Sequence, residues 1–346
     1  MLESFANFLQ NTGLYALISS GGIDAVKTII MIAIACVLLY LAIVKKFEPL
    51  LLLPIAFGML LSNLPMIKDS SAIMMHTEFF TNPEYMTDGK YINVGYICQH
   101  GGLLDLLYLG VKLGIYPPLI FVGIGCMTDF GPLIANPKSI LLGAAAQFGV
   151  FFTFVGALVL SALVPSINFG IKEAASIGII GGADGPTAIY VTKSLAPALL
   201  PAIAVAAYSY MALIPVIQPP IMKLMTRKKD RMIVMEQLRP VSKTEKILFP
   251  IIVTIIVALI IPDAVSLVGC LMLGNLMKES GVVERLTKMA QNELMNIITL
   301  FLGVTVGATA TASSFLSAQT IGIIVLGLIA FCFSTVGGLF LGDIMC

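Results

Sequence analysis

The sequence predicts an all-α membrane protein, a polytopic helical bundle of about eight spanning helices with two or three broken or re-entrant segments. Of its 346 residues, 58% are hydrophobic and only 11% are charged, whereas soluble domains carry roughly 25% charged residues. A water-soluble fold of this length has too little interior to hide so much apolar surface. The apolar residues also stand in long blocks, without the periodicity of half-buried elements, which indicates lipid as the solvent.

The remaining composition argues against several kinds of site. The net charge is +1, so no basic surface for nucleic acid is expected. The cysteines lie far apart without CxxC or zinc spacing, so neither a disulfide nor a metal centre is expected. His76 and His100 stand in a polar stretch and are expected at the surface. Residues 1–25 are expected to form an N-terminal segment, and they lack the pattern of a signal peptide.

The membrane domain is predicted to begin at residue 26 and to continue to residue 346. Its first apolar block, residues 26–44, is followed by charged residues, which indicates a spanning helix with a charged stop. A second block covers residues 50–64. The polar stretch at residues 65–116 is expected outside the membrane, and its amphipathic later part, residues 103–115, is expected to lie along the interface.

Later apolar blocks differ in length. The blocks of spanning character are residues 140–164, 199–216, 247–261, 264–277 and 321–344. Three blocks have 11 residues or fewer, far below the roughly 20 that a spanning helix needs. They are residues 117–127, 174–180 and 297–306.

Residues 221–246 form the one strongly charged stretch, with eight Lys or Arg against three Asp or Glu. Cytoplasmic loops of membrane proteins carry an excess of basic residues, so this loop is expected in the cytoplasm. The charges then serve mainly to fix orientation. A docking surface for a soluble partner is the alternative.

Two of the short blocks run into an aspartate that is followed by glycine and proline: Asp129-Phe130-Gly131-Pro132 and Asp184-Gly185-Pro186. Glycine and proline interrupt helices and free backbone groups. Such groups are tolerated at membrane depth only where protein buries them or where they line a watery cavity. Paired breaks indicate the ion or substrate site of a transporter and are typical of inverted repeats.

Asp184 is the strongest candidate within these breaks, because no Lys or Arg lies within eight positions of it. An uncompensated charge at the bilayer centre costs about 2.5–3.5 kcal/mol, and a bound cation or a proton would compensate it. Sodium takes oxygen ligands, which Asp184, Thr187 and the freed carbonyls around Gly182 offer. The alternative is a helix cap in a turn.

Other polar residues in apolar surroundings are weaker candidates. Asp129 and Asn136 belong to the other break, although Asp129 can also cap a helix. Tyr208 and Tyr210 lie in one apolar helix, where core packing is the better explanation for both. They are two positions apart, so at most one of them faces a given site. Asn275 is a further intramembrane polar group that is equally consistent with packing or with lining a site.

Five runs in this order are similar to the β subunits of the sodium-pumping, biotin-dependent decarboxylases. They are residues 128–137, 181–189, 206–212, 218–223 and 274–277. The resemblance extends from residue 26 to the C-terminus. It implies a membrane subunit that decarboxylates a carboxybiotin, consumes a proton and exports sodium. It also implies that Asp184 is the central sodium and proton residue and that Tyr210 takes part in the proton path.

The resemblance further implies the surroundings of the protein. Sodium and carboxybiotin are the expected small molecules, with the biotin carried by a partner subunit. The expected partners are a biotin-carrier and carboxyltransferase subunit, a small membrane anchor subunit and lipid, and a homo-oligomer is left open. The expected location is the bacterial inner membrane, which the chain crosses several times.

Family members continue for several tens of residues beyond the point that matches residues 342–346, with another broken helix, so part of the family domain is expected to be missing here. Two other functions stay open: a secondary sodium/proton or sodium/solute transporter, and an inactive scaffold. The acid is also open, since oxaloacetate, methylmalonyl-CoA, glutaconyl-CoA and malonate systems share this subunit. Residues 307–312 favour, by resemblance, the systems that use CoA esters.

Overall fold

The computed structural model describes residues 12–19, 21–65, 75–80, 82–88, 91–234 and 238–345. These residues are helical or irregular apart from one antiparallel pair of two-residue strands, β1 (Met86–Thr87) and β2 (Tyr91–Ile92), in which Met86 lies opposite Ile92. The predicted all-α membrane fold is therefore confirmed in its class.

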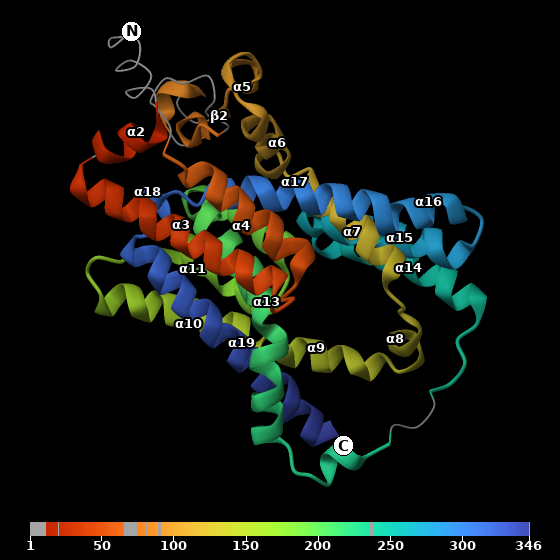
Figure 1. The fold of residues 1–346 in the computed structure, drawn as a ribbon. Helices are drawn as coiled ribbons and strands as arrows, with labels where there is room; N and C mark the ends of the chain where they lie inside the picture. The colour runs from red at the N-terminus through yellow and green to blue at the C-terminus, as the bar shows by residue number, and fades with distance from the viewer. Residues whose placement is uncertain are drawn as a thin grey trace.

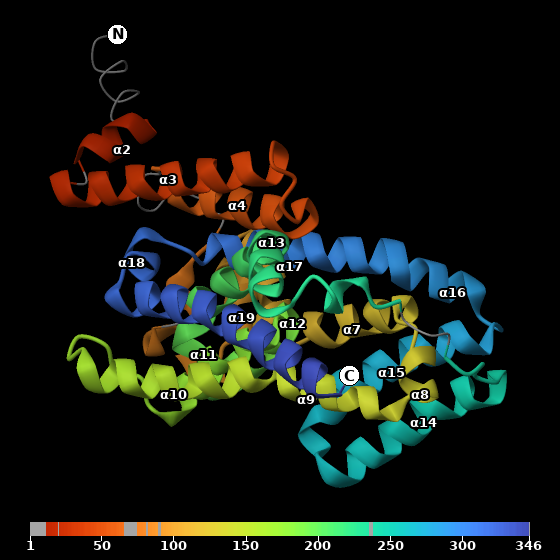
Figure 2. The ribbon, with the colours of Figure 1, turned by 90° about the horizontal axis from the view of Figure 1, so that it is seen from below.

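The N-terminal half opens with a helical hairpin and ends in a long helix. Its helices are α2 (Gly13–Ser19), α3 (Gly22–Ile43), α4 (Pro49–Asn63), α5 (Val94–His100), α6 (Leu103–Lys112), α7 (Tyr116–Met127), α8 (Gly131–Ala135), α9 (Ile140–Ala146), α10 (Phe148–Leu163), α11 (Ile171–Gly178), α12 (Gly185–Leu195) and α13 (Leu200–Met225). Short 3₁₀ turns are η1 (Thr77–Phe80), η2 (Pro83–Tyr85), η3 (Pro137–Ser139), η4 (Ile179–Gly182) and η5 (Pro197–Leu199). In Figure 2, α3 and α4 lie on one face and α10 lies toward the opposite face.

The C-terminal half repeats the pattern of paired and interrupted helices. Its elements are η6 (Asp230–Met232), α14 (Lys243–Ile260), η7 (Pro262–Ala264), α15 (Val265–Ser280), α16 (Glu284–Met289), the π-helical turn η8 (Ala290–Leu294), α17 (Met295–Ala308), α18 (Ala312–Phe315) and α19 (Ala318–Met345). Helices α7, α14, α15 and α16 gather at one end of the molecule, and α19 crosses α13 near its middle (Figures 1 and 2).

Fewer helices than expected are long enough to cross a membrane. Within the described residues, three helical stretches are long and apolar enough to cross a membrane, at residues 22–43, 137–163 and 318–345. The number rises to five if each of two bent pairs forms one span. The other apolar helices are shorter or, like α14, begin with charged residues. The expected count of about eight spans is therefore not reached by length and composition.

The two bends have local causes. The first bent pair, α6 with α7, turns by 70° at Gly114, whose φ of 74° is left-handed and suits glycine. The second bend turns α13 by 60° between Met211 and Leu213. Pro215 lies within this helix and removes the hydrogen bond to the carbonyl four residues earlier, which kinks a helix.

Two helix crossings resemble each other. A Cβ added at Gly58 of α4 would lie 2.1 Å from the Val304 oxygen of α17, and one at Gly274 of α15 would lie 2.0 Å from the Val122 oxygen of α7. Such close approach of backbones is typical of small residues in membrane helices. Near each crossing an asparagine amide donates to a carbonyl beyond the partner helix: Asn63 to Ala310 at 2.8 Å and Asn275 to Thr128 at 3.1 Å.

The expectation for the histidines is only half right. His100 is exposed, but His76 is half-buried, and its Nδ1 lies 2.6 Å from a carboxylate oxygen of Asp105. Asp105 is fully buried and also accepts hydrogen bonds from the backbone N–H groups of His76 and Gly102. Burial of a carboxylate needs such compensation, which draws His76 inward from a polar stretch.

Candidate functional site

The segment around Asp184 is a break between two helices. The turn η4 follows α11 directly, Ala183 adopts a left-handed conformation with φ of 54°, and Asp184 is the N-cap of α12. Pro186 stands in the first turn of α12, where proline has no hydrogen bond to lose. The order Gly-Gly, cap residue and proline therefore ends one helix and starts the next within a few residues.

The Asp184 carboxylate is held by Thr187 through both of its oxygens. The backbone N–H of Thr187 donates to Oδ1 at 3.1 Å, and its hydroxyl donates to Oδ2 at 2.6 Å. The capping role proposed as an alternative is thus present, and it fixes a half-buried carboxyl group at the break.

Neighbouring helices bury the break. A Cβ added at Gly181 would lie 2.9 Å from the Gly149 carbonyl carbon of α10, so only glycine allows this approach. On the other side, the Ser334 hydroxyl of α19 donates to the Gly181 carbonyl at 2.6 Å. The freed carbonyl is therefore satisfied by protein, as broken helices in membranes require.

A cavity of about 560 Å³ opens beside the break. Its wall includes Gly182, Ala183, Gln147, Gln218 and Ser334. It extends to Asp230 of the basic stretch. The cavity therefore leads from the charged loop to the peptide that precedes Asp184, and most of its wall is apolar, as small-molecule sites usually are.

The two tyrosines of α13 face different neighbours, as their spacing predicts. Tyr210 donates a hydrogen bond from its hydroxyl to the Ile324 carbonyl of α19, and its ring meets Phe331 edge-on. Tyr208 packs against the first residue of α12, because a Cβ added at Gly185 would lie 2.5 Å from its ring. Both tyrosines therefore lie near the break: Tyr208 packs on Gly185, and Tyr210 belongs to the apolar cluster that holds Ile180 and Ala188.

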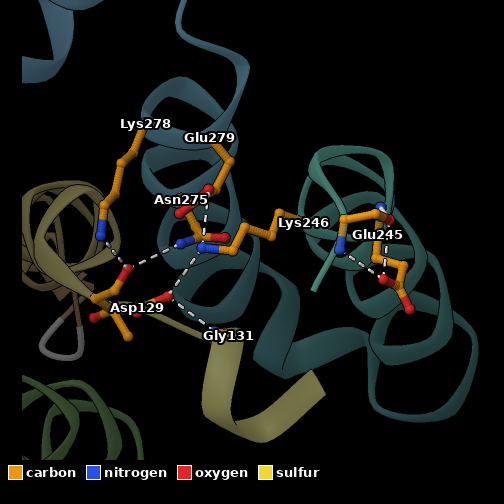
Figure 3. A network of polar contacts seen from close by, with 9 residues as sticks. Asp129, Gly131, Glu245, Lys246, Asn275, Lys278 and Glu279 are labelled. Atoms are coloured by element: carbon orange, nitrogen blue, oxygen red, sulfur yellow. Dashed lines mark hydrogen bonds and ion pairs between the residues drawn. The ribbon is translucent and has the colours of Figure 1, made fainter. Parts of the chain in front are cut away.

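Asp129 belongs to a second polar group, shown in Figure 3. Its carboxylate accepts from the Gly131 N–H at 2.9 Å and lies 3.6 Å from the Lys246 ammonium, which also lies 3.8 Å from Glu279. Lys278 donates to the Thr128 carbonyl at 3.0 Å. Asp129 is more than half exposed, so its ion pair contributes little to stability.

The Asp129 group joins residues that lie far apart in the sequence. It brings together the predicted candidates Asp129 and Asn275. The Asn275 amide and the Lys278 ammonium both donate to the carbonyl of Thr128, the residue between α7 and Asp129. Asn136 is instead exposed in the turn before α9. Sequence reasoning missed Lys246 and Lys278, whose only signal is their place at the ends of apolar blocks.

The start of α14 positions Lys246. Ser242 and Glu245 form a capping box, in which the Ser242 N–H donates to the Glu245 carboxylate at 2.8 Å. The Glu245 carboxylate also accepts a hydrogen bond from the Arg239 guanidinium at 3.0 Å. The cap fixes where α14 begins, and so it directs Lys246 toward Asp129 (Figure 3).

Comparison with known proteins covers nearly the whole chain. Residues 27–346 match the family described as the Na⁺-transporting oxaloacetate decarboxylase beta subunit. The chain is 55% identical to the methylmalonyl-CoA decarboxylase subunit beta of Propionigenium modestum, with 100% of this chain and 83% of that protein aligned.

Two further relatives bear other substrate names. The probable oxaloacetate decarboxylase beta chain of Vibrio cholerae is 48% identical over 99% of this chain and 84% of its own length. The glutaconyl-CoA decarboxylase subunit beta of Acidaminococcus fermentans is 52% identical over 91% of this chain and 75% of its own length. The resemblance noted in the sequence motifs is therefore confirmed, and the chain belongs to the family of beta subunits of sodium-transporting decarboxylases.

Proposed function

We propose that this chain decarboxylates carboxybiotin carried by a partner subunit and uses the reaction to export sodium, with Asp184 as the residue that holds either the sodium ion or the proton. In the chemical step, the bond between the ureido nitrogen and the carboxylate carbon breaks. The electron pair stays on the nitrogen, which takes up a proton, and carbon dioxide leaves. One proton is consumed for each carboxybiotin.

The observation that carries this proposal is the placement of Asp184. Its half-buried carboxylate caps α12 at a helix break, and a cavity of about 560 Å³ runs from this break to the basic stretch. Carboxylate, hydroxyl and carbonyl oxygens suit sodium, and Asp184, Thr187 and Gly182 supply them. The cavity supports entry of the biotin ring from the side of the basic loop.

The membrane setting follows from the same features. The basic stretch at 221–246 supports a cytoplasmic position for that side of the protein, and the location proposed is the bacterial inner membrane. We assign further spans to α4, α14, α15 and α17, which brings the total to seven, or to nine if each bent pair is one span. Helices shorter than a full span are tolerated where they pack against other helices across a break.

The paired crossings support inverted repeats. Helix α4 packs on α17 in the same way as α15 packs on α7. In each pair a glycine lets the two backbones come close, and an asparagine amide donates a hydrogen bond to a carbonyl just beyond the end of the partner helix. Inverted repeats in transporters place the ion site at the interface of the two halves. The Asp129 group then belongs to one supporting crossing, and the proposed ion site stays at Asp184.

The proposed partners are a biotin-carrier and carboxyltransferase subunit and a small membrane anchor subunit. The acid that charges the biotin does not meet this chain, so the site need not record it. Relatives named for CoA esters are 50–55% identical to this chain, against 46–49% for those named for oxaloacetate. This order favours a CoA ester, in agreement with residues 307–312.

The direct test is the release of carbon dioxide from free carboxybiotin by the purified protein in its complex, with and without sodium. We expect activity that depends on sodium and that Asp184→Asn removes. Asn136→Asp is the matched control, because this exposed turn lies outside the proposed site. Sodium transport without any decarboxylation of carboxybiotin would instead establish the secondary transporter.

A further inference from the structure

Another cavity, of about 190 Å³, lies at the opposite end of α13 from the basic stretch. Its wall includes Pro197, just before α13, and Pro201 in the first turn of that helix, whereas the basic stretch follows the end of α13 at Met225. Among the described residues it shares no wall residue with the cavity beside Asp184. The function proposed for Asp184 therefore gives this cavity no role.

Lys112 of α6 carries the only charge on the described part of this wall. Its side chain is half-buried, and its ammonium forms neither a hydrogen bond nor an ion pair with the described residues. The ammonium lies 5.7 Å from the ring centroid of Tyr108, one turn earlier on the same helix, close enough for a cation–π contact. Removing a charge from water is costly unless it is paired and hydrogen-bonded, so this ammonium still lacks an acceptor.

The hydroxyl of Tyr108 is a second donor on the same wall. Tyr108 is 2% exposed, and its ring meets the ring of Phe80 edge-on at 4.9 Å, so packing fixes its position. Its hydroxyl also forms no hydrogen bond with the described residues. Residues four positions apart lie on one face of a helix. One face of α6 therefore brings two donors without acceptors, those of Tyr108 and Lys112, to a single cavity.

The size and the lining of the cavity define the class of ligand. Its volume is below the roughly 300–1,000 Å³ of pockets for drug-sized ligands, so only a small molecule fits. Apart from the two donors and three threonines, the described wall is apolar, and it includes Met75, Phe80 and Pro197. A carboxylate offers about four acceptor positions on its two oxygens, and a short hydrocarbon chain suits the apolar wall.

We propose that this cavity binds a small organic carboxylate, which accepts hydrogen bonds from Lys112 and Tyr108 and packs its hydrocarbon part on the apolar wall. The negative charge of the ligand then supplies the partner that the ammonium lacks. The site is independent of the proposed sodium site, because the two cavities have no described wall residue in common.

The test is a calorimetric titration of the purified full chain in detergent with potassium propionate at a fixed sodium concentration. We expect saturable binding to the wild type. The Kd should rise roughly tenfold or more in both Lys112→Met and Tyr108→Phe, the size of one hydrogen bond to a charged group. Lys172→Met is the matched control, because this exposed lysine lies outside the wall and its loss should leave the Kd unchanged.

Each contrary outcome overturns a stated part of the proposal. A wild type that binds no propionate, an unchanged Kd in either wall variant, or an equal loss in Lys172→Met would overturn the site. Potassium chloride that competes with propionate at equal affinity would overturn the carboxylate as the ligand class. Tyr108→Phe keeps the ring that contacts Phe80 and Lys112, so weaker binding in this variant reports the hydroxyl rather than a loss of folding.

Discussion

At the scale of single residues, Thr187 does as much as Asp184 to define the candidate site. It donates both a backbone and a side-chain hydrogen bond to the carboxylate. The backbone bond is a feature of any capped helix, whereas the 2.6 Å bond from the hydroxyl depends on the identity of the side chain. The two contributions can therefore be separated by substitution.

Thr187→Val removes the hydroxyl and preserves the shape and the backbone bond. If the hydroxyl is a sodium ligand, the half-saturating sodium concentration for decarboxylation should rise by roughly tenfold, the value of one such bond. Thr187→Ser should stay near the wild type because it retains the hydroxyl. If Thr187→Val and Thr187→Ser had the same half-saturating sodium concentration for decarboxylation, that result would contradict a role for the Thr187 hydroxyl oxygen in binding sodium.

At the scale of elements, the two adjacent glycines of the break, Gly181 and Gly182, differ in how closely other atoms pack around them. A Cβ at Gly181 would lie 2.9 Å from the backbone of α10, whereas the nearest atom to a Cβ at Gly182 is 3.8 Å away. Only the first position therefore sets the distance between the break and α10. The carbonyl of Gly182, which is the proposed ligand, is present with any side chain.

Gly181→Ala should destabilise the protein by about 1–3 kcal/mol, because the added methyl group forces packed backbones apart. Gly182→Ala should lie within about 0.5 kcal/mol of the wild type, since nothing crowds the new methyl. Thermal unfolding in detergent, followed for both variants side by side, measures the difference. Equal stability of the two variants would show that η4 and α10 are not in close contact.

The break itself could be predicted from the sequence, because Gly181, Asp184 and Pro186 interrupt an apolar block in a recognisable order. The class of fold followed equally well from composition. The neighbours of the break could not be predicted. Ser334 lies 153 positions from Gly181, and no local pattern reports a partner at that distance.

The tyrosines show a similar limit. Their spacing predicts that they face different sides, and they do, but it does not say which one packs on the first residue of α12. That choice depends on Gly185, which admits the ring of Tyr208. Lys246 and Lys278 were missed for the same reason, since α14 and α15, which carry them, meet the turn between α7 and α8 that contains Asp129 only in the folded chain.

At the scale of the whole molecule, orientation in the membrane decides the direction of transport. The segment between α13 and α14 includes Arg227, Lys228, Lys229 and Arg231, and all four are exposed. If the basic loop is cytoplasmic, trypsin should cut here in inverted vesicles and spare intact spheroplasts. Cleavage in spheroplasts alone would reverse the proposed orientation.

The central claim is that one carboxylate serves both the chemistry and the transport. The most direct test uses proteoliposomes in which the cytoplasmic side of the complex faces outward. Sodium uptake into these vesicles is recorded together with carbon dioxide release from carboxybiotin. Asp184→Asn should abolish both at once, because without the carboxylate neither sodium nor the proton is held at the break. Persistence of either activity in this variant would contradict the account.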